Sequence, residues 1–202
     1  MAINLQKGQR IDLTKGNPTL SQLMVGLGWD PVKTKKSGGL LGSLFGGGGE
    51  PNIDCDASVI MLEDDKFTKK EHLIYFGQLK SRDGSVQHTG DNLTGEGEGD
   101  DEQIMIDLKK VPSNINKLVF VVNIYDCQRR NQDFGMIENA FIRIVDKGNR
   151  EELMRYNLTD NYSGKTTLIA GEIYRQGSDW KFAAVGTGTN DTGLESIVRR
   201  YA

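Results

Sequence analysis

The residues best suited to chemistry lie together in one short window. Residues 91–102 read DNLTGEGEGDDE, with six acidic residues and no basic one. Carboxylates this close repel each other unless a cation lies among them. Asn92 and Thr94 add two more side-chain oxygens, and the window contains no thiol or imidazole. Ligation by oxygen alone suits a hard cation, and Ca²⁺ takes six to eight such ligands in flexible geometry.

Glycines alternate with the carboxylates in this window, at Gly95, Gly97 and Gly99. This pattern makes a poor helix and a poor strand, but glycine lets the backbone curl so that carbonyl oxygens also point inward. The window is therefore a candidate calcium loop. The alternative is a solvated acidic loop that holds no ion.

The window does not match the EF-hand pattern. Counting Asp91 as position one puts Glu102 at position twelve, as that motif requires. Position three is then Leu93, and position six is Glu96 where the motif requires glycine. A calcium site here would have a different geometry.

Two further segments offer carboxylates. Asp54 and Asp56 are two residues apart on one predicted strand, so their side chains point to the same face and could complete the cluster. Asp30, which follows Gly28 and Trp29, is a weaker candidate. Calcium sites in β-sandwiches often lie at one end, between acidic residues of several loops, and these positions would suit such a site.

Other chemistries have less support. His88 could act as a base or a ligand, but a histidine at a strand end, tuned by nearby carboxylates, is the simpler interpretation. A hydrolase needs an open metal position and a base, for which only His88 is at hand. Cys55 falls on the apolar phase of its strand, and neither it nor Cys127 has a neighbouring histidine for nucleophilic work.

The elements that must position these residues are short strands, because the dominant apolar period is two. About ten segments show alternation or a short apolar run. They are residues 3–5, 11–13, 23–30, 53–59, 73–79, 103–108, 118–124, 141–146, 153–156, 169–174 and 180–185.

Only two segments look helical. Residues 131–139 could hold one turn around Phe134, and residues 192–201 could form a helix with a Thr192 cap and Glu195 three residues on. Because strands do not alternate with helices, we predict an all-β fold, an antiparallel β-sandwich with short peripheral helices.

Composition predicts one domain over residues 1–202. Seven of the 25 glycines lie between Gly38 and Gly49, so residues 37–50 are expected to form a flexible inserted loop. The net charge is −3. The acidic window carries −6 and the rest of the chain sums to +3, so the net charge gives no argument for nucleic-acid binding. No stretch approaches 18 apolar residues, and the N-terminus has no secretory h-region. We therefore expect an intracellular chain with reduced thiols and no transmembrane segment.

Five motifs together resemble one family. They are GLGWD at residues 26–30, DCDAS at 54–58, HTGDNLTGEGEGDDE at 88–102, GEIYR at 171–175 and WKF at 180–182. They closely resemble the bacterial tellurium-resistance TerD family. The resemblance covers almost the whole chain, and its acidic motif is long and specific. The Gly-rich insert at 37–50 departs from the compact pattern and leaves the motifs intact.

The resemblance implies a calcium-binding β-sandwich related in architecture to C2-type domains. It implies a cytoplasmic protein, or one loosely associated with the inner membrane surface, from a gene cluster linked to tellurite, phage and colicin tolerance. Two adjacent Ca²⁺ ions are expected. The ligands carried onto this sequence are Asp54, Asp56, Asp91, Asn92, Thr94, Gly95, Glu96, Asp100, Asp101 and Glu102, with Asp30 and Glu98 as secondary candidates.

The functional expectation is a calcium-dependent scaffold or sensor, with other tellurium-resistance proteins of the same cluster as partners and with no enzymatic activity. The alternative is a metal-dependent hydrolase or another enzyme of the resistance system. Direct capture of tellurite ranks last, because an oxyanion is repelled by a loop of charge −6 and two cysteines are few for thiolate capture.

Overall fold

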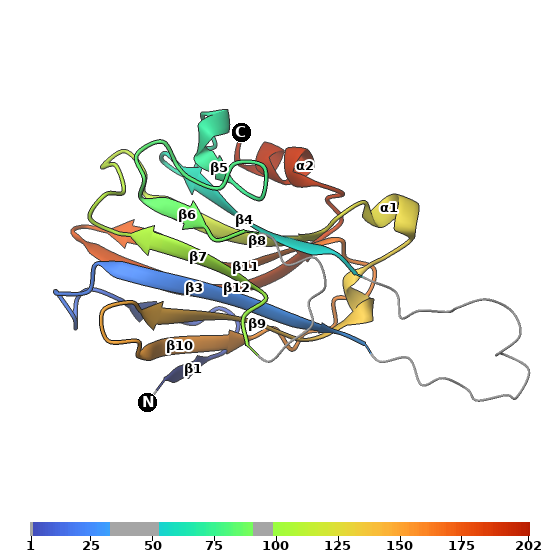
Figure 1. Cartoon of the computed structure of the whole chain (residues 1–202), viewed down its shortest axis with the longest axis horizontal. Helices are drawn as coiled ribbons and strands as arrows, with labels where there is room; N and C mark the ends of the chain where they lie inside the picture. The colour runs from blue at the N-terminus through green and yellow to red at the C-terminus, as the bar shows by residue number, and fades with distance from the viewer. Residues whose placement is uncertain (1, 33–52, 91–98) are drawn as a thin grey trace, which may run out of the picture.

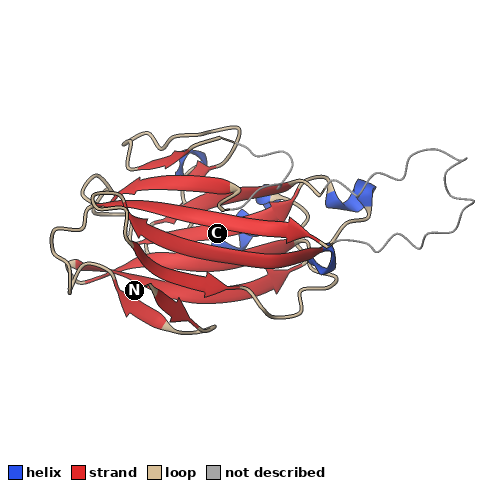
Figure 2. Ribbon diagram, turned by 60° about the horizontal axis from the view of Figure 1, so that its bottom comes forward, coloured by secondary structure: helices blue, strands red, loops and turns tan. Residues whose placement is uncertain are grey.

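Two β-sheets pack face to face. The computed structural model describes residues 2–32, 53–90 and 99–202, and in these ranges twelve strands divide equally between the sheets (Figures 1 and 2). Only short helices lie at the periphery. The predicted β-sandwich is confirmed.

The first sheet, called sheet A, has the order β1-β10-β9-β3-β7-β6. Its strands are β1 (Ile3–Leu5), β3 (Gln22–Pro31), β6 (Val86–His88), β7 (Glu102–Asp107), β9 (Ile137–Asp146) and β10 (Glu152–Asn157). Every pairing is antiparallel except that of β1 with β10. The sequence analysis did not predict β6, which is only three residues long.

The second sheet, called sheet B, has the order β2-β12-β11-β8-β4-β5 and is antiparallel throughout. Its strands are β2 (Arg10–Asp12), β4 (Cys55–Leu62), β5 (Leu73–Ile74), β8 (Lys117–Ile124), β11 (Thr167–Gln176) and β12 (Asp179–Thr189). Strand β5 is shorter than the predicted segment 73–79 and pairs only with Val59 and Ile60, so residues 55–58 of β4 have no strand neighbour on that side within the described ranges. This open edge becomes important at the candidate site.

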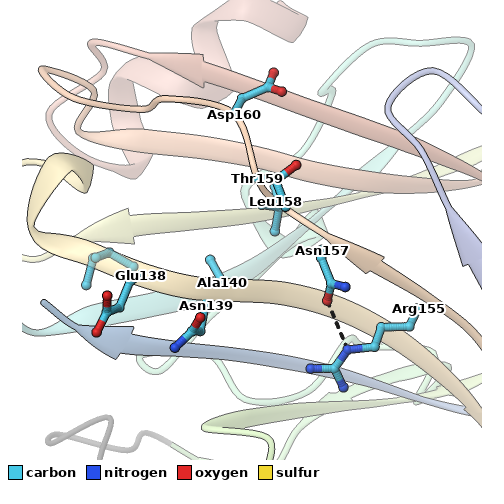
Figure 3. A pocket seen from close by; sticks show the side chains of 9 residues that line it. Glu138, Asn139, Ala140, Arg155, Asn157, Leu158, Thr159 and Asp160 are labelled. Carbon is cyan, nitrogen blue, oxygen red and sulfur yellow. Dashed lines mark hydrogen bonds between the residues drawn. The ribbon is translucent and has the colours of Figure 1, made fainter.

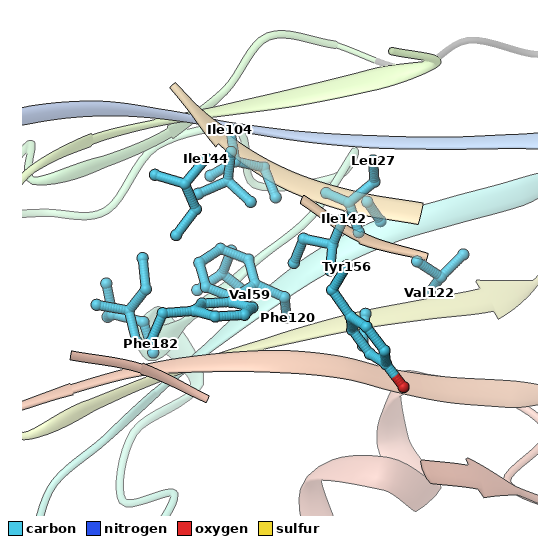
Figure 4. Packing of buried hydrophobic residues seen from close by; sticks show 14 of the residues in the cluster. Leu27, Val59, Ile104, Phe120, Val122, Ile142, Ile144, Tyr156 and Phe182 are labelled. Carbon is cyan, nitrogen blue, oxygen red and sulfur yellow. The ribbon is translucent and has the colours of Figure 1, made fainter. Parts of the chain in front are cut away.

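The main core lies between the sheets, as the period of two requires. Figure 4 shows Leu27, Ile104 and Ile142 of sheet A facing Phe120 and Phe182 of sheet B. All five side chains are at most 1% exposed. The residues of each strand that face this core therefore fix which residues point to the outer faces of the sheets.

A second, smaller apolar cluster covers the outer face of sheet B. The C-terminal helix α2 (Leu194–Val198), followed by the 3-10 turn η3 (Arg199–Tyr201), packs Ile197 against Ile60 and Val121. Strands β4 and β8 are consequently buried on both faces.

The predicted cap of this helix is wrong. Gly193 is the N-cap and no side chain caps the helix. The hydroxyls of Thr166 and Thr167 donate to the Asp191 carbonyl at 2.6 and 2.8 Å, which holds the preceding chain against the sheet. The helix therefore begins beyond Thr192.

Three more helical turns are short. The turn η2 (Phe134–Met136) confirms the prediction around Phe134, whereas α1 (Cys127–Arg130) and η1 (Lys70–His72) were not predicted. In the described ranges, the helices are too short and too polar to cross a bilayer. The predicted loop at 37–50 lies outside the described residues.

Candidate metal centre

Six of the twelve expected ligands are in described parts of the chain, and they gather at one end of the sandwich. Asp30 lies near the end of β3, Asp54 and Asp56 lie at the start of β4, and Asp100, Asp101 and Glu102 lie at the start of β7. The other six, Asp91, Asn92, Thr94, Gly95, Glu96 and Glu98, lie outside the described residues.

Asp56 heads a row of buried oxygens on the outer face of sheet B. It pairs in register with Asn123 of β8, and Ser58 follows two residues later on the same face. These three residues are 4%, 5% and 0% exposed. The Asn123 Oδ1 and the Ser58 Oγ are buried and have no hydrogen-bond partner among the residues that the structure describes. Buried oxygens in this condition are costly unless a donor or a cation reaches them.

The Glu102 side chain points into the sandwich, where it accepts a hydrogen bond from the edge of β4 that β5 does not cover. Its Oε2 accepts a hydrogen bond from the Ala57 N–H at 2.6 Å, and His88 Nε2 lies 3.2 Å from both Glu102 Oε2 and the Ala57 carbonyl. The Gly90 N–H donates to His88 Nδ1 at 3.1 Å, so a neutral ring carries its hydrogen on Nε2. The side chains of Glu102 and His88 are each 1% exposed.

Asp101 lies among other acidic groups. Its Oδ2 accepts a hydrogen bond from the Trp29 N–H at 2.7 Å. Burial is the main cause that raises the pKa of Asp101, to about 6. The Trp29 hydrogen bond lowers this pKa, and the negative charges of nearby Asp30, Glu102 and Asp100 raise it. This carboxyl group is therefore crowded by charges of its own sign.

Asp100 is held on the outer face of sheet A by Arg143. The guanidinium binds it through two hydrogen bonds, Nε to Oδ1 at 2.7 Å and Nη2 to Oδ2 at 2.9 Å, and contacts Glu152 at 2.9 Å. These carboxylates raise the pKa of Arg143 above its usual range. The Asp100 carboxylate lies directly over Gly26, where an added Cβ would come within 2.2 Å of it. Asp100 thus anchors the end of the acidic window to the sheet.

The pKa of the Cys55 thiol is raised by burial and by the carboxylates that surround it at this end of the sandwich. Its pKa lies well above the usual value, first because of burial and then because of the negative charges of Asp56, Asp54, Glu102 and Asp101. Four candidate ligands from two strands of different sheets are therefore near one buried thiol.

The donor chemistry of this end fits a hard cation, since carboxylate, amide and hydroxyl oxygens predominate. The described side chains do not enclose an ion alone: within residues 2–32, 53–90 and 99–202, no three His, Cys, Asp or Glu side chains are placed to hold one. A complete site would need donors from the acidic window as well.

The sequence analysis missed Asn123 and Ser58. Asn123 is the one polar residue inside the apolar run at 118–124, and Ser58 follows Asp56 at the spacing that shares its face. Both signals were present, but burial of this outer face depends on segments that pack over it.

A model of the TerD domain matches residues 1–201. The chain is 73% identical over 201 residues to stress response protein SCP2 of Bacillus subtilis (strain 168), and it is 42% identical over 202 residues to tellurium resistance protein TerD of Serratia marcescens. These alignments cover all of this chain in both cases, and 100% and 97% of the relatives.

The fold is also that of a solved structure, a homologue of telluride resistance protein (TerD) from Streptomyces coelicolor A3(2). The TM-score is 0.67 at 19% identity, covering 91% of this chain and 98% of that one. With the match over residues 1–201, these findings show that the chain belongs to the TerD family of tellurium-resistance and stress-response proteins.

Proposed function

We propose that the chain is a calcium-binding module of a bacterial stress and tellurite-resistance system, acting as a calcium-dependent scaffold or sensor. The observation that carries the proposal is the buried oxygen row of Asp56, Ser58 and Asn123. Two of its oxygens have no hydrogen-bond partner among the described residues. A cation would compensate the carboxylate and the two uncharged oxygens together.

The position of this row supports the proposal. The described residues that border the acidic window are Gly90, whose N–H donates to His88, and Gly99, whose carbonyl oxygen lies close to Gly28. Both residues belong to the end that carries Asp56. Calcium bound here would supply positive charge among groups that otherwise repel each other, and its binding energy would order the end of the sandwich.

The proposed role is not enzymatic. A hydrolase would need a base that faces substrate, but His88 is 2% exposed and both of its ring nitrogens are engaged in hydrogen bonds. The partners proposed are other tellurium-resistance proteins of the same cluster, and the site of action is the cytoplasm or the inner membrane surface. The names of the relatives, which include TerD and TerZ, support a role in tellurium resistance and do not bear on the mechanism.

Calorimetric titration of the full chain with Ca²⁺ and with Mg²⁺ tests the proposal. We expect Ca²⁺ to bind more tightly, and the substitutions Asp56→Asn and Asn123→Ala to weaken it about tenfold or more, as loss of a charged or a neutral oxygen ligand should. Glu195→Gln is the matched control, because the Glu195 side chain is 84% exposed and forms an ion pair with Arg199 away from the oxygen row. If millimolar Ca²⁺ gives neither binding heat nor a higher melting temperature, the calcium role is wrong.

A further inference from the structure

A groove opens on sheet A where two paired strands separate. Strands β9 and β10 pair as far as Phe141 and Asn157, and one more hydrogen bond joins the Leu158 N–H to the Ala140 carbonyl at 2.8 Å. Beyond that point the chains diverge around a cavity of about 600 Å³ (Figure 3). This volume is within the range of small-molecule sites.

One end of the groove presents a fixed cation. The Arg155 guanidinium lies 3.6 Å from the centroid of the Phe141 ring, and its Nε donates to Asn157 Oδ1 at 3.0 Å. Neither contact uses the terminal nitrogens, and Arg155 forms no ion pair within the described ranges. A stacked, preoriented guanidinium is suited to two-point recognition of a carboxylate.

The other end presents an anion. Glu138 is exposed and, across the residues that the structure describes, has no ion-pair partner. Its neighbour Asn139 is held by donating to Asp30 Oδ2 at 2.8 Å. Asp160 also borders the groove, but Lys7 compensates its charge at 2.6 Å. In Figure 3, Asn139 lies between Glu138 and the Arg155 guanidinium.

The spacing of the two charges sets the size of a ligand. Phe141, beneath the guanidinium, is three residues from Glu138 on β9, and the left-handed backbone of Asn139 between them makes a bulge, so this stretch is somewhat shorter than the about 10 Å of regular strand. A peptide of two or three residues spans a comparable length. Polar side chains predominate in the lining between the charges, where Asn139 and Asn157 offer amide groups, and Ile137 and Leu158 contribute a smaller apolar part.

We propose that this groove binds a short zwitterionic peptide of about three residues, with its terminal carboxylate on Arg155 and its ammonium group on Glu138. The two charged ends select a ligand that carries both charges, and the Asn139 and Asn157 amides can hydrogen-bond a peptide backbone between them. This site uses none of the buried oxygen row that carries the proposed calcium role, and it touches the candidate ligands only where Asn139 donates to Asp30.

Titration of the ¹⁵N-labelled full chain with triglycine, followed by NMR in the presence of EDTA, tests the proposal. We expect saturable shifts of backbone amides at residues 137–140 and 155–160. N-acetyl-triglycine lacks the cation and triglycine amide lacks the anion, so each should bind about tenfold more weakly than triglycine. Equal binding of all three peptides, or no saturable shift, would overturn the proposal.

Substitutions separate recognition from folding. Arg155→Gln and Glu138→Gln should each weaken triglycine about tenfold, and Arg155→Lys should fall between wild type and Arg155→Gln because it keeps the charge without the planar fork. Arg82→Gln is the control, since Arg82 is 84% exposed and lies outside the groove. Spectra of the free variants show whether each is folded. Unchanged affinity in the folded Arg155→Gln variant would refute the role of the guanidinium.

Discussion

The Glu102 carboxylate ties the two sheets together at the acidic end. Because β5 stops at Ile74, no strand in the described part of the chain pairs with the Ala57 N–H and carbonyl on that side of β4. Glu102 accepts from the N–H, and His88 donates to the carbonyl. Both side chains come from sheet A, so hydrogen bonds that a neighbouring strand would otherwise supply are made across the sandwich.

Glu102→Ala should lower the free energy of unfolding by about 2–3 kcal/mol, because it leaves the Ala57 N–H buried without an acceptor. Glu102→Gln keeps an acceptor oxygen and should cost less than half as much. Urea unfolding in EDTA measures both without a contribution from bound metal. Equal losses in the two variants would mean that charge rather than the hydrogen bond holds this junction.

The two thiols should be inert in the folded protein. Cys55 is 1% and Cys127 2% exposed, and burial beside carboxylates raises the pKa of Cys55. Because the thiolate is the reactive form, a raised pKa lowers reactivity at neutral pH. We expect almost no reaction with a disulfide reagent until urea unfolds the chain, and then two thiols per molecule. Rapid native reaction of a Cys127→Ser variant would contradict this and revive a thiol-based role.

At the scale of the elements, β3 is built to let another chain segment lie flat on it. An added Cβ at Gly28 would lie 2.3 Å from the Phe141 ring and 2.8 Å from the Gly99 carbonyl oxygen. Gly26 is similarly covered by the Asp100 carboxylate. The end of the acidic window therefore rests on glycines of the GLGWD motif, which gives that motif a packing role.

Gly28→Ala should destabilise the fold by about 2–3 kcal/mol, because ring and backbone must both move to admit a methyl group. Gly16→Ala is the control: an added Cβ at Gly16 meets nothing within 4 Å. Chemical denaturation of the two variants measures the difference. A Gly28→Ala protein as stable as the control would show that β3 and the Asp100 segment shift easily.

Strand elements were predictable where a period of two is sustained, as in β7, or where an apolar run is nearly continuous, as in β8. The same alternation that buries Ile104 and Ile106 also turns Glu102 inward, so its interior position was readable from register. The three-residue β6 is too short to show a period, and α1 follows Asp126 in a left-handed conformation that the sequence does not signal. The start of α2 depends on tertiary hydrogen bonds to Asp191, which no local cap rule contains.

At the scale of the whole molecule, acidic composition located the candidate metal centre, but it could not rank the ligands. Asp100 binds Arg143, and Glu102 accepts a hydrogen bond from the Ala57 N–H. Asp56 pairs in register with Asn123 and shares a face of β4 with Ser58. These roles follow from which face of which sheet each residue occupies. Sequence spacing gives the face relative to a strand neighbour, and only the packed sandwich shows what covers that face.

Both sheets share one core, so they should unfold together. Trp29 lies in β3 of sheet A and Trp180 in β12 of sheet B, and they are 5% and 4% exposed. Trp29→Phe leaves a reporter in sheet B, and Trp180→Phe leaves one in sheet A. We expect fluorescence and far-UV circular dichroism to give coincident urea midpoints within each variant, as a two-state domain requires.

Calcium sharpens this experiment. If it binds at the acidic end of a sandwich that unfolds as one unit, saturation at about 100 times the dissociation constant should raise the free energy of unfolding by about 2.7 kcal/mol in both variants equally. Mg²⁺ at the same concentration is the control for ionic strength. Separate midpoints for the two tryptophans, or stabilisation seen by one reporter only, would mean that the sheets are distinct folding units and that the metal stabilises just one of them.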